Sequence, residues 1–481
     1  MSQDEEPITE SNRNSYTISE IPSKPFRITM EFPLFFTMLS MSLMITVINN
    51  IILYRTCVHS LNHSHEECKI FLSPAKNNMS QELEDEVQSY ATFVTMLKTT
   101  IESVAPAILS FFLGVWSDTH GRKPLITWPL LGMSVTGGLI VVYSMMEDLG
   151  PWWYILTLLP VSLAGGFTVL FTGAYCYMSD VTSTEHRSLR MTILEASVSA
   201  GSVIGSLLCP KLIALVGNVY LLLISNTLVV IAYVFTVIYV RESLTGAVQG
   251  GLCSVLDLNL VREMFRDCFK KRPNRGRTQI LLLAVANSLT IFIFYGLMSL
   301  DYMYTREKLH WATKQYTTYS AASTAITFFG SFFGVMLVQK YLRVSDLAFA
   351  IIAFLSAIAH YMIKAFAVTT WHMYLSVGIA MFKGLSSPLI RSLLTKILPV
   401  VDIAKVFALM GALEGVSPLI SPTLFNSLYF ATIKIFPGAI YILCSAITAV
   451  CVVFLGIVQY YRWRTTSITY ENLTPGDSTS S

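Results

Sequence analysis

Twelve long apolar runs determine what this chain can fold into. A helix needs about 20 consecutive, mostly apolar residues to cross the hydrocarbon core of a bilayer. Only 13% of the 481 residues are charged, about half the share that is usual in soluble domains. The sequence therefore predicts an all-α membrane protein with twelve transmembrane helices, and it excludes a soluble enzyme. The runs cover residues 30–54, 92–113, 125–146, 152–178, 191–213, 219–240, 279–303, 316–338, 347–367, 371–394, 403–428 and 437–460.

Lysine and arginine residues predict which loops face the cytosol, because basic residues gather on the cytosolic side of membrane proteins. Arg122 and Lys123 lie between the second and third runs, and Arg187 and Arg190 precede the fifth run. Eight further basic residues lie in 241–278. With an even number of spans, both chain ends are then cytosolic. The net charge is only +3, which indicates the lipid bilayer and no nucleic acid as a partner.

The basic segment 241–278 follows the sixth run and divides the chain into halves of six spans, 30–240 and 279–460. Polar tails precede and follow them, at 1–29 and 461–481. No apolar run begins at Met1, so we expect no cleaved signal peptide. The fifth and eleventh runs resemble each other locally, since Glu195 and Glu414 each precede small and serine residues. Together these features indicate two related six-helix repeats.

The longest loop on the predicted outer side, residues 55–91, has the features of an oxidising, glycosylated compartment. Asn62 and Asn78 each begin an Asn-x-Ser acceptor sequence for N-glycosylation. Cys57 and Cys68 are the two cysteines predicted on that side. A short disulfide between them is therefore expected, with two free thiols as the alternative.

The loop between the second and third runs carries the most specific short motif, Gly114-x-x-x-Asp118-x-x-Gly121-Arg122-Lys123. It resembles the signature loop of the major facilitator superfamily. Gly114 permits close helix packing, and Gly121 permits a tight turn. Asp118 can pair with a basic residue, while Arg122 and Lys123 stay in the cytosol. We expect this cluster to form and break as a cytosolic gate; an ordinary basic loop is the alternative.

Glu195 is the first of several ionisable residues inside the runs, where charge is expensive and indicates function. Three serines follow it on one helix face, at positions 199, 202 and 206, while Gly201 and Gly205 lie on another face. This pattern predicts a water-facing side and a closely packed side. Glu195 can then exchange protons in a cavity, and an ion pair with Arg187 or Arg190 is the alternative.

The tenth and eleventh runs supply further candidates. Lys383, Ser387 and Arg391 recur every four residues with no acid in the same run, which suggests an anion-attracting wall. Arg391 could instead mark the cytosolic end of the helix. Glu414 repeats the pattern of a glutamate followed by serines.

Four other charged residues have simpler explanations, although Glu102 is also a candidate for substrate binding or coupling. Glu102 follows Lys98 by four residues, so these two charges can neutralise each other. Lys364 and Asp301 lie near the ends of their runs and can extend toward water. The sequence contains no P-loop, no zinc-ligand spacing and no catalytic motif. We therefore expect no enzyme activity, no cofactor and no metal.

With these residues in hand, the chain resembles solute carrier family 46, the proton-coupled folate transporter family within the major facilitator superfamily. The resemblance extends over most of the chain. It is carried by the outer loop, the 117–123 loop, the stretch 179–196, which ends Leu194-Glu195-Ala196, and the stretch 388–429, which begins Pro388-Leu389-Ile390-Arg391-Ser392.

The resemblance implies a secondary active transporter that moves an organic anion into the cytosol with protons. It places the proton-coupling glutamate at Glu195, a substrate and coupling arginine at Arg391 and the gate aspartate at Asp118. Two departures matter: the seventh run lacks a histidine, and the loop after it lacks a cysteine. The first puts folate as the cargo in doubt, and the second leaves Cys57 and Cys68 as the available disulfide pair.

The membrane of residence and the transport mode stay open. The tail sequence Tyr470-Glu471-Asn472-Leu473 fits a tyrosine-type sorting signal, so the plasma membrane and the endolysosomal membrane are both possible. A pH-independent facilitator or exchanger with the same fold is one alternative. A non-transporting membrane receptor is another. The oligomeric state is not specified by the sequence.

Overall fold

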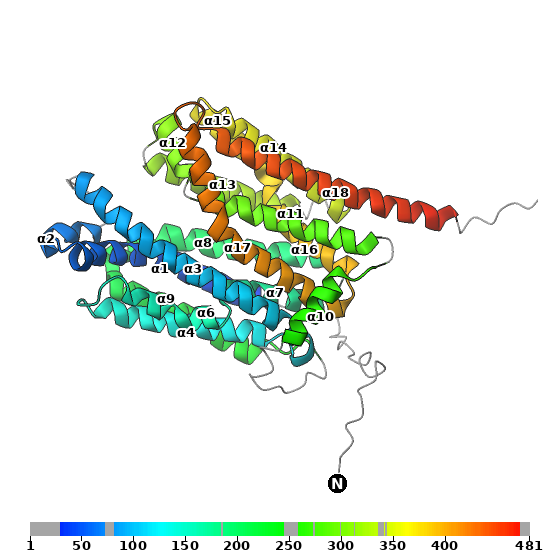
Figure 1. The fold of residues 1–481 in the computed structure, drawn as a ribbon, viewed down its shortest axis with the longest axis horizontal. Helices are drawn as coiled ribbons and strands as arrows, with labels where there is room; N and C mark the ends of the chain where they lie inside the picture. The colour runs from blue at the N-terminus through cyan, green and yellow to red at the C-terminus, as the bar shows by residue number, and fades with distance from the viewer. Residues whose placement is uncertain are drawn as a thin grey trace, which may run out of the picture.

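The computed structural model describes residues 29–72, 81–183, 186–244, 258–272, 275–298, 300–311, 313–334, 341 and 344–471, and this part of the chain contains helices and no strand. Eleven helical segments within it are long and apolar enough to cross a membrane. The helices run side by side in two bundles (Figure 1). The predicted all-α membrane fold is therefore confirmed.

The N-terminal bundle contains the first six predicted spans. Gly201 and Gly205 of its fifth span pack against the first span, since a Cβ at either glycine would overlap the backbone of Phe35 or Leu39. This is the close contact that the two glycines predict. The helices are α1 (Glu31–Arg55), α3 (Gln81–His120), α4 (Pro124–Met145), α5 (Trp153–Thr157), α6 (Leu159–Leu163), α7 (Gly166–Val181), α8 (Arg187–Val216) and α9 (Asn218–Tyr239).

The C-terminal bundle contains the remaining spans. Its helices are α11 (Gly276–Leu297), α12 (Leu300–Leu309), α13 (Thr313–Phe333), α14 (Asp346–Ala365), α15 (Thr370–Ile379), the 3₁₀ helix η7 (Ala380–Leu385), α16 (Ser386–Ile397), α17 (Val400–Thr432) and α18 (Ala439–Glu471). The predicted span 316–338 falls on α13, which is rich in Thr, Ser and Tyr and is not among the eleven apolar segments. Residues 335–340 lie outside the described residues, so the count of twelve stays a prediction.

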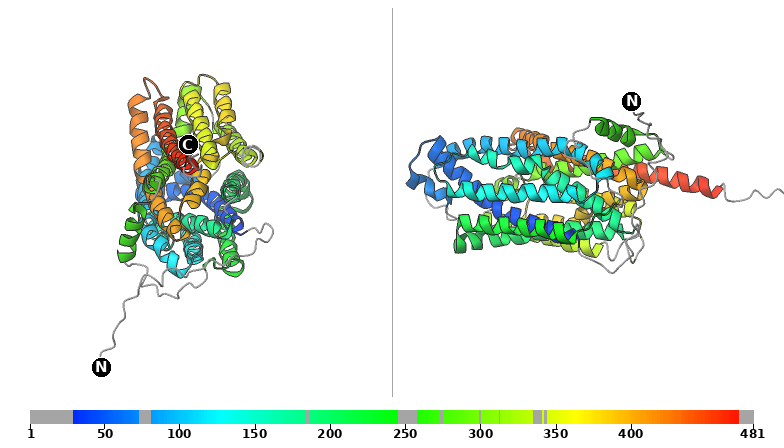
Figure 2. Two further views of the ribbon diagram at one scale, coloured as in Figure 1. Left: turned by 90° about the vertical axis from the view of Figure 1, so that its right-hand side faces the viewer. Right: turned by 90° about the horizontal axis from the view of Figure 1, so that it is seen from below.

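Several elements differ from the predicted ranges. The apolar run 371–394 is divided among α15, η7 and α16 instead of forming one continuous helix. The helix α10 (Leu258–Phe269) lies in the predicted loop 241–278. Both α3 and α18 extend beyond their apolar runs, and α18 projects past the other helices (Figure 2).

The outer loop forms a small folded cap. A π-helical turn η2 (Thr56–Ser60), α2 (His65–Cys68) and a 3₁₀ turn η3 (Lys69–Leu72) follow α1. Ser64 and Glu67 form a capping box at the start of α2. A disulfide joins Cys57 to Cys68, with the two Cα atoms 5.9 Å apart. Asn62 is exposed, whereas Asn78 lies outside the described residues.

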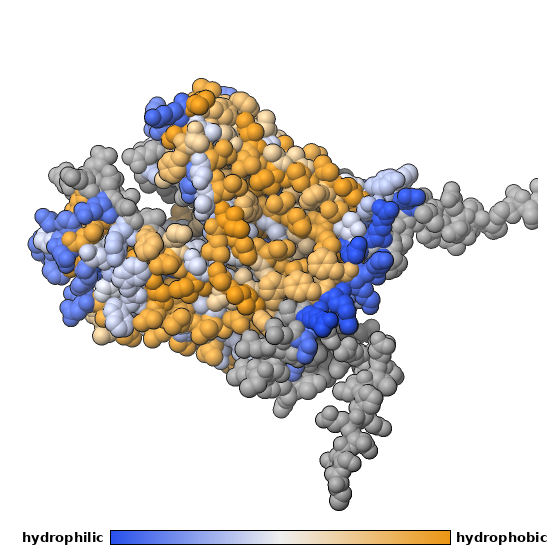
Figure 3. All heavy atoms as spheres, viewed as in Figure 1, coloured by the Kyte–Doolittle hydropathy of each residue, from blue (hydrophilic) through white to orange (hydrophobic). Residues whose placement is uncertain are grey.

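On the face shown in Figure 3, an apolar belt lies between two polar ends. Following the charge-based prediction, we call the end with α2 the outer end and the opposite end the cytosolic end. The two bundles diverge toward the outer end, and the surface is hollowed between them there (Figures 1 and 3). They approach each other at the cytosolic end. The molecule is therefore open at the outer end and closed at the cytosolic end.

Candidate functional site

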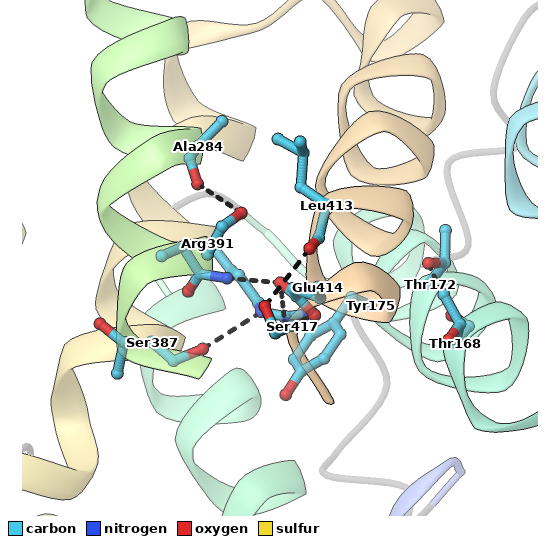
Figure 4. A network of polar contacts seen from close by, with 12 residues as sticks. Thr168, Thr172, Tyr175, Ala284, Ser387, Arg391, Leu413, Glu414 and Ser417 are labelled. Atoms are coloured by element: carbon cyan, nitrogen blue, oxygen red, sulfur yellow. Dashed lines mark hydrogen bonds and ion pairs between the residues drawn. The ribbon is translucent and has the colours of Figure 1, made fainter. Parts of the chain in front are cut away.

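A polar network joins the two bundles near the middle of α11 and α17. The Arg391 side chain on α16 donates from Nη2 to both carboxylate oxygens of Glu414 on α17, at 2.9 and 3.0 Å. Asn287 on α11 donates to Glu414 Oε1 at 2.5 Å. Arg391 is 7% exposed and Asn287 is fully buried. Figure 4 shows Arg391 and Glu414 directed toward each other.

Tyr175 on α7 connects this ion pair to the N-terminal bundle. Its ring lies against the Arg391 guanidinium, with 4.1 Å between the guanidinium carbon and the ring centroid, a cation–π contact. Its hydroxyl donates a hydrogen bond to Oε1 of Glu195 on α8. Tyr175 is 1% exposed. Five helices therefore contribute to one network, and Tyr175 is the link between the halves.

The network holds one fixed cation and two carboxylates. Arg391 interacts electrostatically with both Glu414 and Glu195. When both carboxylates are ionised, the site has one net negative charge, because arginine keeps its proton. Charge that is shielded from water is costly in a membrane. The site can therefore accept an additional negative charge far more easily after it has taken up protons.

Three predicted site residues, Glu195, Arg391 and Glu414, thus come together in space. Tyr175 and Asn287 were missed, because neutral polar residues are common in transmembrane helices and give no signal in the sequence. In the described part of the chain, the contacts of the two basic residues before Glu195 lead to other partners. Arg190 pairs with Glu31 at 3.0 Å, and Arg187 donates to the Thr395 carbonyl at 2.8 Å.

The serines after Glu195 are less distinctive than predicted. Ser202 and Ser206 donate hydrogen bonds to carbonyl oxygens of their own helix, at Val198 and Ser202. Ser417, after Glu414, does the same at Leu413. Back-bonding of this kind lets a hydroxyl satisfy itself within a helix. These serines therefore line the helix without adding to the network.

Lys383 and Arg391 contact different groups, and the single cationic wall stays a prediction. Lys383 lies in the 3₁₀ turn η7 and Arg391 in α16, so the register between them differs from that of one continuous α-helix. Lys383 Nζ lies 4.4 Å from the ring centroid of Tyr361 on α14. Arg391 instead faces Tyr175 and has an acidic partner on α17. A coupling role for Lys383 stays a prediction.

Lys98 and Glu102 form a loose pair on α3, with 3.9 Å between Nζ and Oε2. Their side chains are 15% and 37% exposed. This geometry agrees with mutual neutralisation of neighbouring charges. Lys364 and Asp301 do not extend toward water as expected. They form a buried ion pair within the C-terminal bundle, and Tyr441 donates to Asp301 at 2.5 Å.

The two glycines of the gate motif occupy positions that only glycine fits. A Cβ on Gly114 would overlap Ala408 of α17, so α3 and α17 touch there across the two halves. Gly121 has φ +108°, in the left-handed region. A Cβ on Gly121 would also overlap the Glu242 carboxylate. Glu242 in turn accepts the backbone N–H groups of Arg122 and Lys123, at 2.7 and 3.0 Å.

Arg122 is buried instead of solvated, which corrects the expectation that it stays in the cytosol. It is 1% exposed, donates from Nε to Asp180 at 3.2 Å and donates from Nη1 to Ser117 at 2.8 Å. The carboxylate of Asp180 offsets the cost of burying the guanidinium. Asp118 lies in the last turn of α3, and its side chain is outside the described part of the structure.

A second set of contacts closes the cytosolic end between the halves. Ser188 at the start of α8 donates to Asp346 on α14 at 2.9 Å and lies 2.8 Å from the Ser392 hydroxyl on α16. Lys396 pairs with Asp346 at 2.5 Å. Sequence reasoning missed this cluster, because basic residues at the ends of spans are also what topology requires.

The helix α10 spans the same end of the molecule. Asp267 pairs with Lys405 at 2.5 Å, and Arg272 pairs with Asp402 at 2.8 Å, both on α17. Phe265 stacks on Phe111 of α3, with ring centroids 5.7 Å apart. The helix therefore contacts both halves. Burial raises the pKa of the Cys268 thiol on its inner side to about 12, so this cysteine is unreactive at neutral pH.

Comparison with known proteins identifies the fold family. The family model of the Major Facilitator Superfamily matches residues 34–422, which is most of the chain. The chain belongs to the major facilitator superfamily. In the part of this chain that the structure describes, no group of three potential metal ligands converges.

The curated relatives are members of solute carrier family 46, which confirms the predicted resemblance. A Drosophila melanogaster protein named "Probable peptidoglycan muropeptide transporter SLC46" is 28% identical, over 87% of this chain and 83% of its own. The proton-coupled folate transporter of Bos taurus is 22% identical, over 80% and 82%. The lysosomal proton-coupled steroid conjugate and bile acid symporter SLC46A3 of Gallus gallus is 24% identical, over 84% and 85%.

Solved structures share the fold. The human organic anion transporter MFSD10 superposes with a TM-score of 0.68 at 14% identity, over 89% of this chain and 97% of that one. The transporter FucP in its outward conformation gives 0.63 at 13% identity, over 89% and 98%. The fold is thus that of a multi-pass membrane carrier.

Proposed function

We propose that this protein is a secondary active transporter that moves an organic anion into the cytosol together with protons. The observation that carries the proposal is the network of Glu195, Tyr175, Arg391 and Glu414, which joins the two halves. A site of this composition couples anions to protons by charge balance alone. No cofactor or metal enters the mechanism.

The coupling follows from the competition for Arg391. With both carboxylates ionised, Glu414 occupies the guanidinium through two hydrogen bonds. Protonation of Glu414 weakens that hold, and protonation of Glu195 removes a second negative charge beside Arg391. Arg391 is then left to bind the carboxylate, sulfate or phosphate of a cargo, for which its planar fork is suited. Loss of the proton restores the ion pair and expels the anion. Anion and proton therefore bind together and leave together.

Alternating access would carry the bound anion and proton from one side of the membrane to the other. In the conformation described here, the cytosolic end is closed by Ser188, Asp346 and Lys396 and by α10, while the surface is hollowed at the outer end (Figure 3). A rocking motion of the two halves would break these contacts and expose the network to the cytosol. The gate cluster of Gly121, Arg122 and Asp180 lies within the N-terminal half beside this closure.

The nature of the cargo is supported by the relatives. Their names include muropeptides, folate, steroid conjugates and bile acids, all of which are organic molecules with acidic groups. The shared chemistry is an anionic group attached to a large, partly apolar body. We therefore propose an organic anion of this kind as the substrate. An acidic lumen at the endolysosomal membrane, or an acidic exterior at the plasma membrane, would supply the protons.

The test is uptake of a panel of anions into cells that carry the protein, at acidic and neutral outside pH. The panel contains a folate, a conjugated steroid, a muramyl peptide and a cyclic dinucleotide. Each compound is compared between the wild type and Glu195→Gln, a variant that keeps the shape and hydrogen-bonding ability of the side chain but cannot ionise. Labelling of the outer loop measures how much protein reaches the surface.

We expect acid-stimulated uptake of at least one compound, with the acid stimulation lost in Glu195→Gln. Uptake that does not depend on pH and is unchanged by the substitution would instead indicate a facilitator or exchanger. If binding of a compound persists without uptake, and Glu195→Gln leaves binding unchanged, the protein acts as a receptor.

A further inference from the structure

The cytosolic end of the molecule carries a rim that transport does not explain. We define the basic rim as Arg262, Arg266, Lys270, Lys271, Arg275 and Arg277, which lie on α10, after it and at the start of α11. All six side chains are exposed. Figure 3 shows hydrophilic surface of this kind at the cytosolic end, directly beside the apolar belt.

The exposed face of α10 combines two kinds of side chain. Arg262, Phe265, Arg266, Phe269 and Lys270 recur at helical spacing and are all exposed, the two phenylalanines at 41% and 47%. The rings of Phe265 and Phe269 stack on each other, with centroids 6.4 Å apart. Large apolar and cationic side chains on one exposed face are typical of helices that lie at the headgroup level of a membrane.

Two described carboxylates near this helix have inward partners. Asp267 pairs with Lys405, and it also lies 4.0 Å from Arg266 Nε, while Asp402 pairs with Arg272. These pairs also fix the helix against α17, so its outer face has one defined orientation. An anchored cationic surface loses little conformational freedom when it binds an anion.

The end of α18 continues the rim. Tyr460 and Trp463 are 52% and 65% exposed and lie on one face of the helix. Arg275 ties α18 to the start of α11, since it donates to the Tyr461 hydroxyl at 2.9 Å and lies over that ring. Tyrosine and tryptophan concentrate at the membrane–water interface. The signal that sets membrane topology requires only basic residues. The exposed aromatic side chains therefore need another explanation.

We infer that the basic rim and the adjacent aromatic side chains bind the headgroups of anionic phospholipids in the cytosolic leaflet. The cations contact the phosphate and carboxylate groups, and Phe265, Phe269 and Trp463 reach the boundary with the acyl chains. Because α10 contacts α3 and α17, lipid bound there favours the conformation that is closed to the cytosol. This inference does not depend on the identity of the transported anion.

The experiment uses the full chain purified in an uncharged detergent. Dioctanoyl phosphatidylserine is titrated, with dioctanoyl phosphatidylcholine as the neutral comparison, and bound lipids are counted by native mass spectrometry. The test variant is Lys270→Gln/Lys271→Gln. The matched control is Lys69→Gln/Lys434→Gln, which removes the same charge from exposed residues of the outer end. Thermal unfolding in the absence of added lipid verifies that each variant is folded.

We expect the wild type to bind phosphatidylserine more tightly than phosphatidylcholine, by a factor of about ten or more. Each basic side chain near an anionic surface contributes roughly fivefold, so the test variant loses at least about tenfold in affinity and the control loses none. Equal losses in both variants, or equal binding of both lipids, would overturn the inference. Should the test variant fail to fold, Arg262→Gln/Arg277→Gln probes the same rim at two other exposed positions.

The variant Phe265→Ser/Phe269→Ser distinguishes binding of the whole lipid from binding of its headgroup alone. We expect it to weaken binding of dioctanoyl phosphatidylserine by several-fold and to leave binding of glycerophosphoserine, which lacks acyl chains, unchanged. If glycerophosphoserine binds as tightly as the lipid, the rim is a site for soluble anions and the membrane assignment is wrong.

Discussion

Two buried networks of this protein contain the same kinds of groups and differ in where they lie. In the central network, Arg391 pairs with Glu414, and a tyrosine hydroxyl donates to a second carboxylate. In the C-terminal bundle, Lys364 pairs with Asp301, and the Tyr441 hydroxyl donates to the same carboxylate. The first network joins five helices from both halves. The second joins α12, α14 and α18 of one half.

This difference in location predicts a difference in role. When the two halves rock against each other, contacts across their interface must rearrange, whereas contacts within one half move as a body. The central network is therefore suited to coupling. The Lys364–Asp301 pair is suited to holding α12, α14 and α18 together, whatever the conformation. Substitutions in the two networks should accordingly affect different measurements.

The largest effect on stability is expected from Lys364→Met. It leaves Asp301 without its cation in a membrane interior, and breaking a buried pair in this way costs about 3–5 kcal/mol. We expect a large decrease in the unfolding temperature of the purified protein, with uptake per folded molecule unchanged. Adding Asp301→Asn to the same chain should restore most of the stability. A normal unfolding temperature with lost uptake would place this pair in the coupling machinery.

The largest effect on uptake is expected from Arg391→Lys. The ammonium keeps the charge but cannot reproduce the planar contact with Tyr175 and the two bonds to Glu414. We expect uptake to decrease by about tenfold or more, with little change in unfolding temperature. Arg272→Lys is the matched control, because Arg272 also pairs with a carboxylate but lies outside the network. If both variants transport equally well, Arg391 has no special role.

The sequence predicted the charged members of the central network, because a charge inside an apolar run is conspicuous. It could not predict their partners. Tyr175 and Asn287 are ordinary residues of apolar helices, and they reach Glu195 and Glu414 only through the packing of five helices. Likewise, the 3₁₀ turn at 380–385 is not visible as a break in the apolar run, so Lys383 and Arg391 seemed to share a face.

The same limit explains why the ion pair of Lys364 and Asp301 was not predicted. Each lies near the end of its run, which suggests that it extends toward water. They pair because α12 and α14 lie next to each other. The spacing of residues along the chain does not reveal that contact. The apolar runs, the fold family and the glycines of the gate loop were predictable, because each depends on local sequence. Long-range ion pairs were not.

An intermediate effect is expected from Tyr175→Phe. The ring and its contact with Arg391 remain, but the hydrogen bond to Glu195 is lost. The hydroxyl holds the Glu195 carboxylate beside the ring that contacts Arg391, so its loss leaves that carboxylate less well placed. We expect maximal uptake to fall, by no more than about fivefold. Tyr175→Ala, which also removes the ring, should reduce maximal uptake further.

Tyr361→Phe serves as the control for that change, since the Tyr361 ring contacts Lys383 within one half. It should leave maximal uptake unaltered. A decrease in Tyr361→Phe, or no decrease in Tyr175→Phe, would contradict the proposed link through Tyr175. Each of the two variants removes a single hydroxyl. One hydroxyl lies at the interface between the halves, and the other lies inside one half.

The smallest effect is expected from Glu102→Gln. Its partner Lys98 is 3.9 Å away on the same helix, and the carboxylate side chain is about one-third exposed, at 37%. Loose, partly exposed pairs contribute about 0–1 kcal/mol, so uptake should change by less than about twofold at any pH. Exchanging the two charges, in Lys98→Glu/Glu102→Lys, should be equally harmless. A tenfold loss in either variant would mean that an ion pair within one half can also lie on the transport path, and the distinction between interface and internal networks would then fail.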